Sequence, residues 1–190
     1  MYHVINDKRA RVSSEMLYVG LMDCLKTKPL SELTITEISD RAGVGRTTFY
    51  RNFDNPIDIL HMKCDACFDE ATNDLIHEYE RGVRDSEALL ACFLRYWMDH
   101  IDLMNALIDA NRLDIIYSCH RLHFDKLMST LFPQVNKESD DYVYFVSLRS
   151  GLLTGSIMAW GTTGRKKNPE EVAAIIVKYL KDFLKGNYQL

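Results

Sequence analysis

Residues that interrupt helices are scarce in this sequence. Four prolines occur among 190 residues, and each lies between segments of helical periodicity. The dipeptides Asn-Gly and Asp-Gly, which form tight β-hairpin turns, do not occur, and no stretch alternates apolar and polar residues over the length of a strand. These absences argue against a β-sheet protein.

Long hydrophobic runs are also missing. The most apolar stretch, residues 142–164, contains Arg149, and the uncharged run from 150 to 164 has only 15 residues. A membrane-spanning helix needs about 20 predominantly apolar residues, so we expect no membrane span. The first twenty residues lack the apolar run of a secretory signal peptide. Because the five cysteines are also an odd number, we expect reduced thiols in a cytoplasmic protein.

The common motifs of enzymes do not occur: there is no G-x-x-x-x-G-K-[ST], H-E-x-x-H or G-x-S-x-G. Cys64 and Cys67 have no second Cys pair to complete a zinc site, and we interpret them as small apolar side chains on a helix. Cys119 and His123, one helical turn apart, leave a metal-sensing site open as an alternative. We expect no enzymatic activity, no cofactor and no metal.

Several segments show the period of a helix with one apolar face. Leu17, Leu21 and Leu25 have this spacing, and residues 172–184 keep it for more than three turns. The sequence therefore predicts an all-α fold, with helices at 7–27, 35–42, 46–52, 56–82, 86–109, 113–131, 138–162 and 169–185.

Residues 33–53, LTITEISDRAGVGRTTFYRNF, predict two short helices joined by a tight turn. Thr34 and Glu37 have the spacing of a capping box at the start of the first helix. Gly43 and Gly45 supply the backbone freedom for a turn before the second. Such a pair forms a helix-turn-helix unit. Its small core would consist of Ile38, Ala42, Val44, Phe49 and Phe53.

The charge of this unit differs from that of the whole chain. The chain has 23 basic and 27 acidic residues, a net charge of −4, whereas residues 41–52 contain three arginines and no acid. A local basic patch on an acidic chain is typical of binding to a polyanion. The second short helix would expose Arg46, Thr47, Thr48, Tyr50 and Arg51.

The same segment resembles the N-terminal signature of the TetR family of bacterial transcriptional regulators, T-x-x-x-I-A-x-x-A-G-V-S-x-x-T-x-Y-x-x-F-x-x-K-x-x-L-L. The strong match covers residues 8–62, and a weaker one covers 142–184. Gly45 stands where a Ser usually caps the second helix, and Pro56 stands where a Lys is usual. The matching residues are Thr34, Ile38, Ser39, Ala42, Gly43, Val44, Thr48, Tyr50, Phe53, Ile59 and Leu60.

The resemblance implies DNA contacts from both short helices. The residues that would enter the major groove are Arg46, Thr47 and Thr48. The residues that would contact phosphates are Thr34, Thr36, Tyr50 and Asn52. Arg51 is either a further contact or a solvated surface charge, and Tyr50 has the alternative of a half-buried core residue. Pro56 cannot bind a phosphate as the usual Lys does, and Lys8, Arg9 or Arg11 could compensate.

The rest of the chain is expected to form a larger domain. We place a DNA-binding domain at residues 1–55 and a helical ligand-binding and dimerisation domain at 56–190. The final helix has a long apolar stripe, which favours a homodimer built from 138–162 and 169–185. Large side chains that either fill the core or line a pocket for a small apolar effector are Phe68, Phe93, Trp97, Met98, Tyr117, Phe124 and Phe145.

The sequence thus predicts a DNA-binding transcriptional regulator, a ligand-responsive repressor that acts as a homodimer on a palindromic operator. The alternative is an α-helical protein-interaction module that does not bind DNA.

Overall fold

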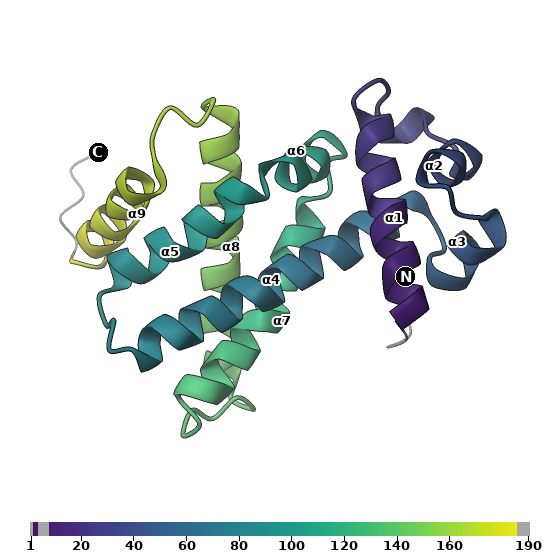
Figure 1. Ribbon diagram of the computed structural model, residues 1–190. Helices are drawn as coiled ribbons and strands as arrows, with labels where there is room; N and C mark the ends of the chain where they lie inside the picture. The colour runs from purple at the N-terminus through teal and green to yellow at the C-terminus, as the bar shows by residue number, and fades with distance from the viewer. Residues whose placement is uncertain (1, 4–7, 186–190) are drawn as a thin grey trace. The chain divides into compact units, whose positions relative to one another are not determined.

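The computed structural model describes residues 2–3 and 8–185, and this part of the chain is built from helices without a strand (Figure 1). The all-α prediction is confirmed. The elements in chain order are α1 (Lys8–Leu25), η1 (Leu30–Glu32), α2 (Ile35–Ala42), α3 (Arg46–Asn52), α4 (Pro56–Glu80), α5 (Ser86–Asp99), α6 (Ile101–Asp109), α7 (Leu113–Leu131), α8 (Asp140–Thr162) and α9 (Pro169–Leu184).

The single helix predicted over 86–109 is wrong, because the chain breaks at His100. The His100 ring stacks on the Tyr96 ring, with 4.4 Å between their centroids, and His100 Nδ1 lies 2.9 Å from the Tyr96 carbonyl oxygen. In a continuous helix, that oxygen would accept from the His100 backbone N–H. A side chain thus competes for a backbone acceptor, and α5 and α6 form instead of one helix.

The chain divides into two compact units. The first comprises Met1–Cys67 and Asp102–Ile116, and the second comprises Phe68–Ile101 and Tyr117–Leu190. The first unit therefore extends beyond the boundary we expected after residue 55. It includes the beginning of α4, most of α6 and the beginning of α7.

The first unit is held together by the close packing of α1 on α2. Gly20 faces Ala42 so closely that a Cβ at position 20 would lie 2.8 Å from the Ala42 Cβ and 2.9 Å from its backbone nitrogen. Ile38, Phe49 and Phe53 are fully buried beside this contact, as the predicted helix-turn-helix core requires, whereas Val44 is half-buried. The helix crossing therefore depends on a glycine in α1.

The second unit has an aromatic core and a helical layer formed by α5 and α9, which pack together. Phe68 and Trp97 are in contact, with ring centroids 4.8 Å apart. The Trp160 indole N–H donates to the Lys167 carbonyl oxygen at 2.9 Å and so ties the end of α8 to the segment that leads to α9.

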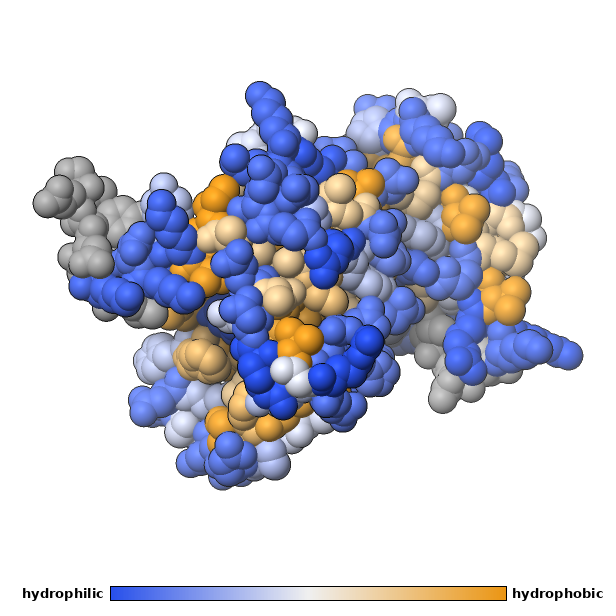
Figure 2. Space-filling view, turned by 60° about the vertical axis from the view of Figure 1, so that its left-hand side comes forward, coloured by the Kyte–Doolittle hydropathy of each residue, from blue (hydrophilic) through white to orange (hydrophobic). Residues whose placement is uncertain are grey.

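The surface of the described residues is mostly hydrophilic on the face in Figure 2, where hydrophobic residues appear in small separate groups. No helix among the described residues is long and apolar enough to cross a membrane. The same residues contain no group of three or more His, Cys, Asp or Glu side chains arranged to hold a metal ion. All five cysteines are thiols.

Candidate nucleic-acid interface and ligand cavity

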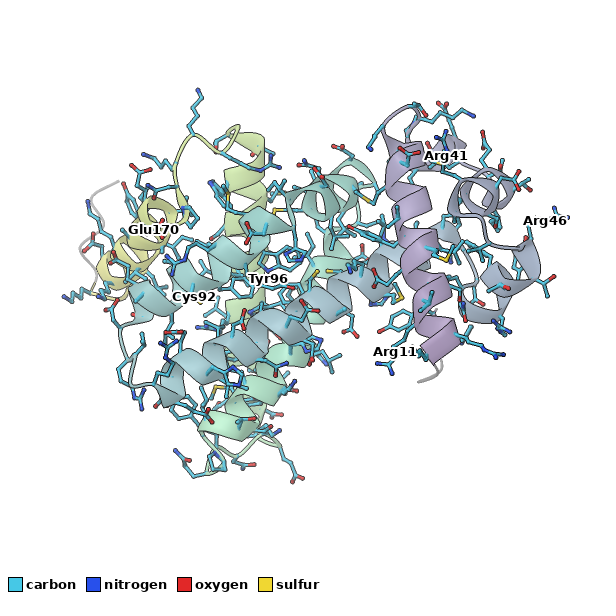
Figure 3. The ribbon with its side chains drawn as sticks, viewed as in Figure 1. Arg11, Arg41, Arg46, Cys92, Tyr96 and Glu170 are labelled. Carbon is cyan, nitrogen blue, oxygen red and sulfur yellow. The ribbon has the colours of Figure 1, made fainter. Side chains whose placement is uncertain are left out.

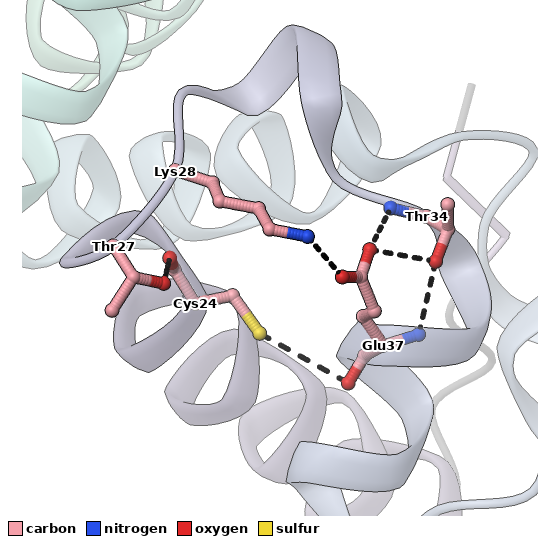
Figure 4. A network of polar contacts seen from close by, with 5 residues as sticks. All are labelled: Cys24, Thr27, Lys28, Thr34 and Glu37. Carbon is pink, nitrogen blue, oxygen red and sulfur yellow. Dashed lines mark hydrogen bonds and ion pairs between the residues drawn. The ribbon is translucent and has the colours of Figure 1, made fainter.

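The start of α2 is fixed by a complete capping box (Figure 4). The Thr34 hydroxyl accepts from the Glu37 backbone N–H at 3.2 Å, and the Glu37 carboxylate accepts from the Thr34 backbone N–H at 3.0 Å. Lys28 donates to the other carboxylate oxygen. The hydrogen bond from Lys28, followed by those from Thr34, lowers the pKa of Glu37 to about 2. This acid is therefore ionised at any physiological pH.

The capping box confirms the cap predicted at Thr34, but it takes up the donors that the predicted phosphate contact of Thr34 would need. Its hydroxyl hydrogen is donated to Glu37 Oε2 at 2.8 Å, and its backbone N–H is donated to the same oxygen. Both donors are used inside the protein, so Thr34 has none left for a phosphate in this conformation. Thr34 is a helix cap.

The turn between α2 and α3 has the predicted glycine geometry. Gly43 has a φ of 64°, in the left-handed region that favours glycine, and its N–H donates to the Asp40 carbonyl at 3.1 Å. Gly45 is the N-cap of α3 and provides no side-chain hydrogen bond. This short turn leads directly into the helix that carries Arg46.

The outer face of α3 presents a basic and hydroxyl-rich surface. Arg46, Thr47 and Arg51 are exposed, and Thr48 is partly exposed. In Figure 3 the Arg46 side chain projects away from the helices of the first unit. Arg46 Nη1 lies 3.5 Å from Thr36 Oγ1, which brings predicted contacts from α2 and α3 together. The Tyr50 side chain is 58% exposed, so the alternative of a half-buried core tyrosine is wrong.

Asn52 does not belong to this surface, and its predicted phosphate contact is wrong. Its side chain is 1% exposed and donates through Nδ2 to the Ser13 hydroxyl at 3.2 Å. The α3 helix ends here, and the last residue turns inward toward α1. Asn52 thus joins α3 to α1 and is not available to DNA.

Two residues at the N-terminus, which sequence reasoning missed, also fix the end of α3. The His3 backbone N–H donates to the Asn52 carbonyl at 2.7 Å, and Tyr2 pairs with Phe53 in an isolated antiparallel bridge. The Tyr2 hydroxyl donates to Asp65 on α4 at 2.7 Å. No periodic signal in the sequence marks these contacts, because they join segments that lie from about fifty to 63 positions apart.

The basic patch is smaller than its arginine content indicates. Arg41 donates to Asp23 of α1 at 2.7 Å, and this ion pair offsets its charge. The exposed residues Lys8 and Arg11, which could compensate for the missing Lys at position 56, lie on the first turns of α1. Arg46 and Arg51 are therefore the arginines that α3 itself offers to a polyanion.

Solved structures share this arrangement of helices over nearly the whole chain. The Listeria innocua protein Lin0861 aligns with 96% of this chain and 97% of its own, with a TM-score of 0.75 and 14% identity. A TetR transcriptional regulator from Streptococcus agalactiae aligns with 90% of this chain and 96% of its own, with a TM-score of 0.59 and 15% identity. FadR from Thermus thermophilus is a TetR-family repressor that was solved with lauroyl-CoA. It aligns with 89% of this chain and 93% of its own, with a TM-score of 0.54 and 14% identity.

The chain has the TetR-type fold. No family model matches the sequence, and no curated protein does. The likeness to the solved structures thus establishes the fold, and it agrees with the resemblance seen in residues 8–62.

The second unit of this TetR-type fold contains a cavity of about 600 Å³. Its walls come from α4, α5, α7, α8 and α9 and are mostly apolar. Ligand cavities in proteins have volumes of about 300–1,000 Å³, so this one could enclose a small molecule. The predicted pocket residues that lie in its wall are Phe68, Phe93, Phe124 and Phe145. Their contact with a ligand stays a prediction.

Three predicted pocket residues do not line the cavity. Trp97 is fully buried and packs on Phe68 within the core, whereas Met98 lies on the surface with 40% exposure. Tyr117 lies one turn before His120, where the part of α7 that lines the cavity begins. Helical periodicity identifies the apolar faces of helices, but it does not indicate which residues on those faces line a cavity.

His120 is a buried polar group in the cavity wall. Its Nδ1 lies 2.8 Å from the Ser150 hydroxyl oxygen. Burial, followed by the nearby Arg149 and His123, lowers the pKa of His120 to about 3. The imidazole is therefore neutral at physiological pH.

Proposed function

We propose that this protein is a DNA-binding transcriptional regulator, a homodimeric repressor that responds to a small ligand. The observation that carries the proposal is the exposed face of α3 in a helix-turn-helix unit, where Arg46, Thr47, Tyr50 and Arg51 are all accessible. The solved structures with this fold that are named as TetR regulators support it.

In this proposal, α3 enters the major groove of duplex DNA. The Arg46 guanidinium can donate two hydrogen bonds to guanine O6 and N7, and Thr47 and Thr48 suit thymine methyl groups or phosphates. The Thr36 and Tyr50 hydroxyls and the Arg51 side chain would contact phosphates, which position the protein without selecting a sequence. Affinity should fall steeply with salt, because neutralised phosphates release counterions.

The homodimer would use α8 and α9. Tyr144 and Leu148 of α8 are each 75% exposed, and they share a helix face with Gly151 and Gly155, where an added Cβ would meet nothing within 4 Å. These two glycines therefore make no close crossing within the described chain. The exposed Ile175 and Tyr179 of α9 add to the apolar surface. Such a surface is typical of an interface between copies, which twofold symmetry would make self-complementary.

A substitution in α8 tests the dimer. Leu148→Glu would bury two unpaired carboxylates at a twofold interface, so sedimentation should show monomers and DNA affinity should fall at least about tenfold. Leu122→Glu is the matched control, because Leu122 is 60% exposed on α7 and lies outside this surface. Leu148→Glu protein that remained dimeric would contradict the assignment of the interface.

The ligand response would arise from the cavity. A ligand that binds the DNA-free and DNA-bound forms unequally must change DNA affinity, and DNA must change ligand affinity by the same factor. The FadR structure was solved with lauroyl-CoA, which supports a small-molecule effector in this fold. For a repressor, the ligand favours release from DNA, and transcription resumes.

Selection of genomic fragments tests the whole proposal, because no operator is assumed. The purified protein should enrich fragments that contain a palindrome with half-sites about one DNA turn apart, roughly 34–36 Å. Folded, dimeric protein that enriched no fragment at low salt would overturn the proposal and favour a protein-interaction module.

A further inference from the structure

The cavity of the second unit is basic as well as apolar. Three cationic side chains line it, namely Arg84, Arg149 and Lys181, and no Asp or Glu occurs among its described lining residues. The whole chain has the opposite balance, with 27 acidic against 23 basic residues. All three side chains are exposed, so they can reach a molecule that enters the cavity, and an anionic group would be favoured there.

Arg149 is the most informative of the three. Its guanidinium carbon lies 4.5 Å from the centroid of the Phe124 ring, a cation–π arrangement on the cavity wall. Its side chain is accessible because it borders the cavity, yet surrounding protein atoms lower the pKa of its guanidinium. Among the described residues, no carboxylate lies within ion-pair distance of Arg149.

Neighbouring polar groups do not supply the missing negative charge. Asp125 on α7 accepts a hydrogen bond from the Tyr142 hydroxyl at 2.6 Å, and no ion pair joins it to Arg149. His120 is neutral and faces Ser150. The guanidinium therefore keeps donors for a group that enters the cavity.

The other two cations lie in separate wall segments. Arg84 belongs to the loop between α4 and α5, where it donates to the Tyr79 and Val83 carbonyls and stacks on the Tyr79 ring. Lys181 lies near the end of α9. Between the charged groups, the wall is apolar, with side chains such as Leu75, Leu127 and Met128.

We propose that the cavity binds an anionic amphiphile, a molecule with one anionic head group and an apolar body. Arg149 holds the head group through charge-assisted hydrogen bonds, and the leucine, methionine and phenylalanine side chains enclose the apolar body. Arg84 and Lys181 add positive potential that excludes cationic molecules. Only one part of this inference rests on the proposed function, namely that the bound molecule is the effector.

Four decyl compounds that differ only in the head group test the proposal by calorimetric titration of the purified full chain. Decanoate and decyl phosphate should each bind at least about tenfold more tightly than 1-decanol, and decylamine should bind more weakly still. A stronger response to one anion would identify the head group as carboxylate or phosphate. Equal binding of all four compounds, or no binding of either anion, would overturn the proposal.

Variants of Arg149 locate the head group. Arg149→Met should reduce the preference for decanoate over decanol to about twofold or less, whereas Arg149→Lys should keep part of it. Arg121→Met removes an exposed arginine of α7 that does not line the cavity, and it should leave the preference unchanged. Wild-type-like preference in folded Arg149→Met would refute the role of this residue.

The same titrations separate this inference from the proposed function. If the protein binds the anions selectively but its DNA affinity does not change, the proposed ligand class is supported and the proposed regulatory response is wrong. If the protein binds DNA sequence-specifically but shows no preference among the four compounds, the proposed regulator function is supported and the proposed ligand class is wrong.

Discussion

Replacing Gly20 with alanine should destabilise the first unit, although alanine is the better helix former. The new Cβ would lie 2.8 Å from the Ala42 Cβ, 2.9 Å from its nitrogen and 3.0 Å from its Cα. Two of these atoms belong to the α2 backbone, so no side-chain rotation relieves the clash. The helices must move apart instead.

The magnitude follows from two opposing effects. Overpacking of a buried site costs about 1–3 kcal/mol, whereas replacing glycine with alanine inside a helix gains about 0.5–1 kcal/mol. The net destabilisation lies between about 0 and 2.5 kcal/mol, and the clash with backbone atoms favours the upper part of this range. Amide exchange through opening of α1 and α2 should therefore accelerate by up to about 70-fold.

Hydrogen exchange measured by mass spectrometry can follow this destabilisation separately in the two units. Both tryptophans, Trp97 and Trp160, belong to the second unit, so their fluorescence reports whether that unit remains intact. Gly45→Ser is the matched control, because an added Cβ there meets nothing within 4 Å and a serine N-cap should stabilise α3 slightly. Unchanged or slower exchange of α1 and α2 in Gly20→Ala would refute the reasoning about this helix contact.

Two further predictions concern pH and can be checked by denaturant titrations across the acid range. The pKa of Glu37 is lowered from 4.5 to about 2 in the folded chain, so its stabilising effect is complete above about pH 4.5 and lost as pH falls toward 2. Glu37→Gln should lack this part of the acid dependence, and an identical profile would contradict the capping-box account. The pKa of His120 is lowered from 6.5 to about 3, so the unfolded chain takes up a proton first and stability should fall as pH drops from 6.5 toward 3. His120→Gln should show a flatter profile over that range, and an equally steep one would show that His120 is not the cause.

The helix-turn-helix was predictable because its signals are local. Thr34 and Glu37 lie three residues apart, and Gly43 follows directly after the last residue of α2, so the observed bounds of α2 and α3 are the predicted ones. Such caps act through backbone groups of the same few residues. The exposure of Arg46 and Tyr50 follows from the same short helix, once Phe49 is assigned to the core.

Features that depend on distant partners were not predictable. Asn52 turns toward Ser13, thirty-nine positions away. The helix break at His100 was not predictable either, because no Gly or Pro marks it in the sequence. The cationic wall of the cavity joins a loop, α8 and α9, and no sequence window contains all three.

Binding of DNA by α3 is the central claim about this protein. The measurement is fluorescence anisotropy with a DNA fragment enriched from the genome. Arg46→Ala should weaken binding by about 5- to 150-fold, because a bidentate contact contributes about 1–3 kcal/mol of discrimination. The same variant should lose base preference at one base pair of each half-site. Arg121→Ala, which removes an exposed arginine from the second unit, should bind as the parent does. Arg46→Ala protein that bound the same fragment with the affinity and selectivity of the parent would contradict the central claim.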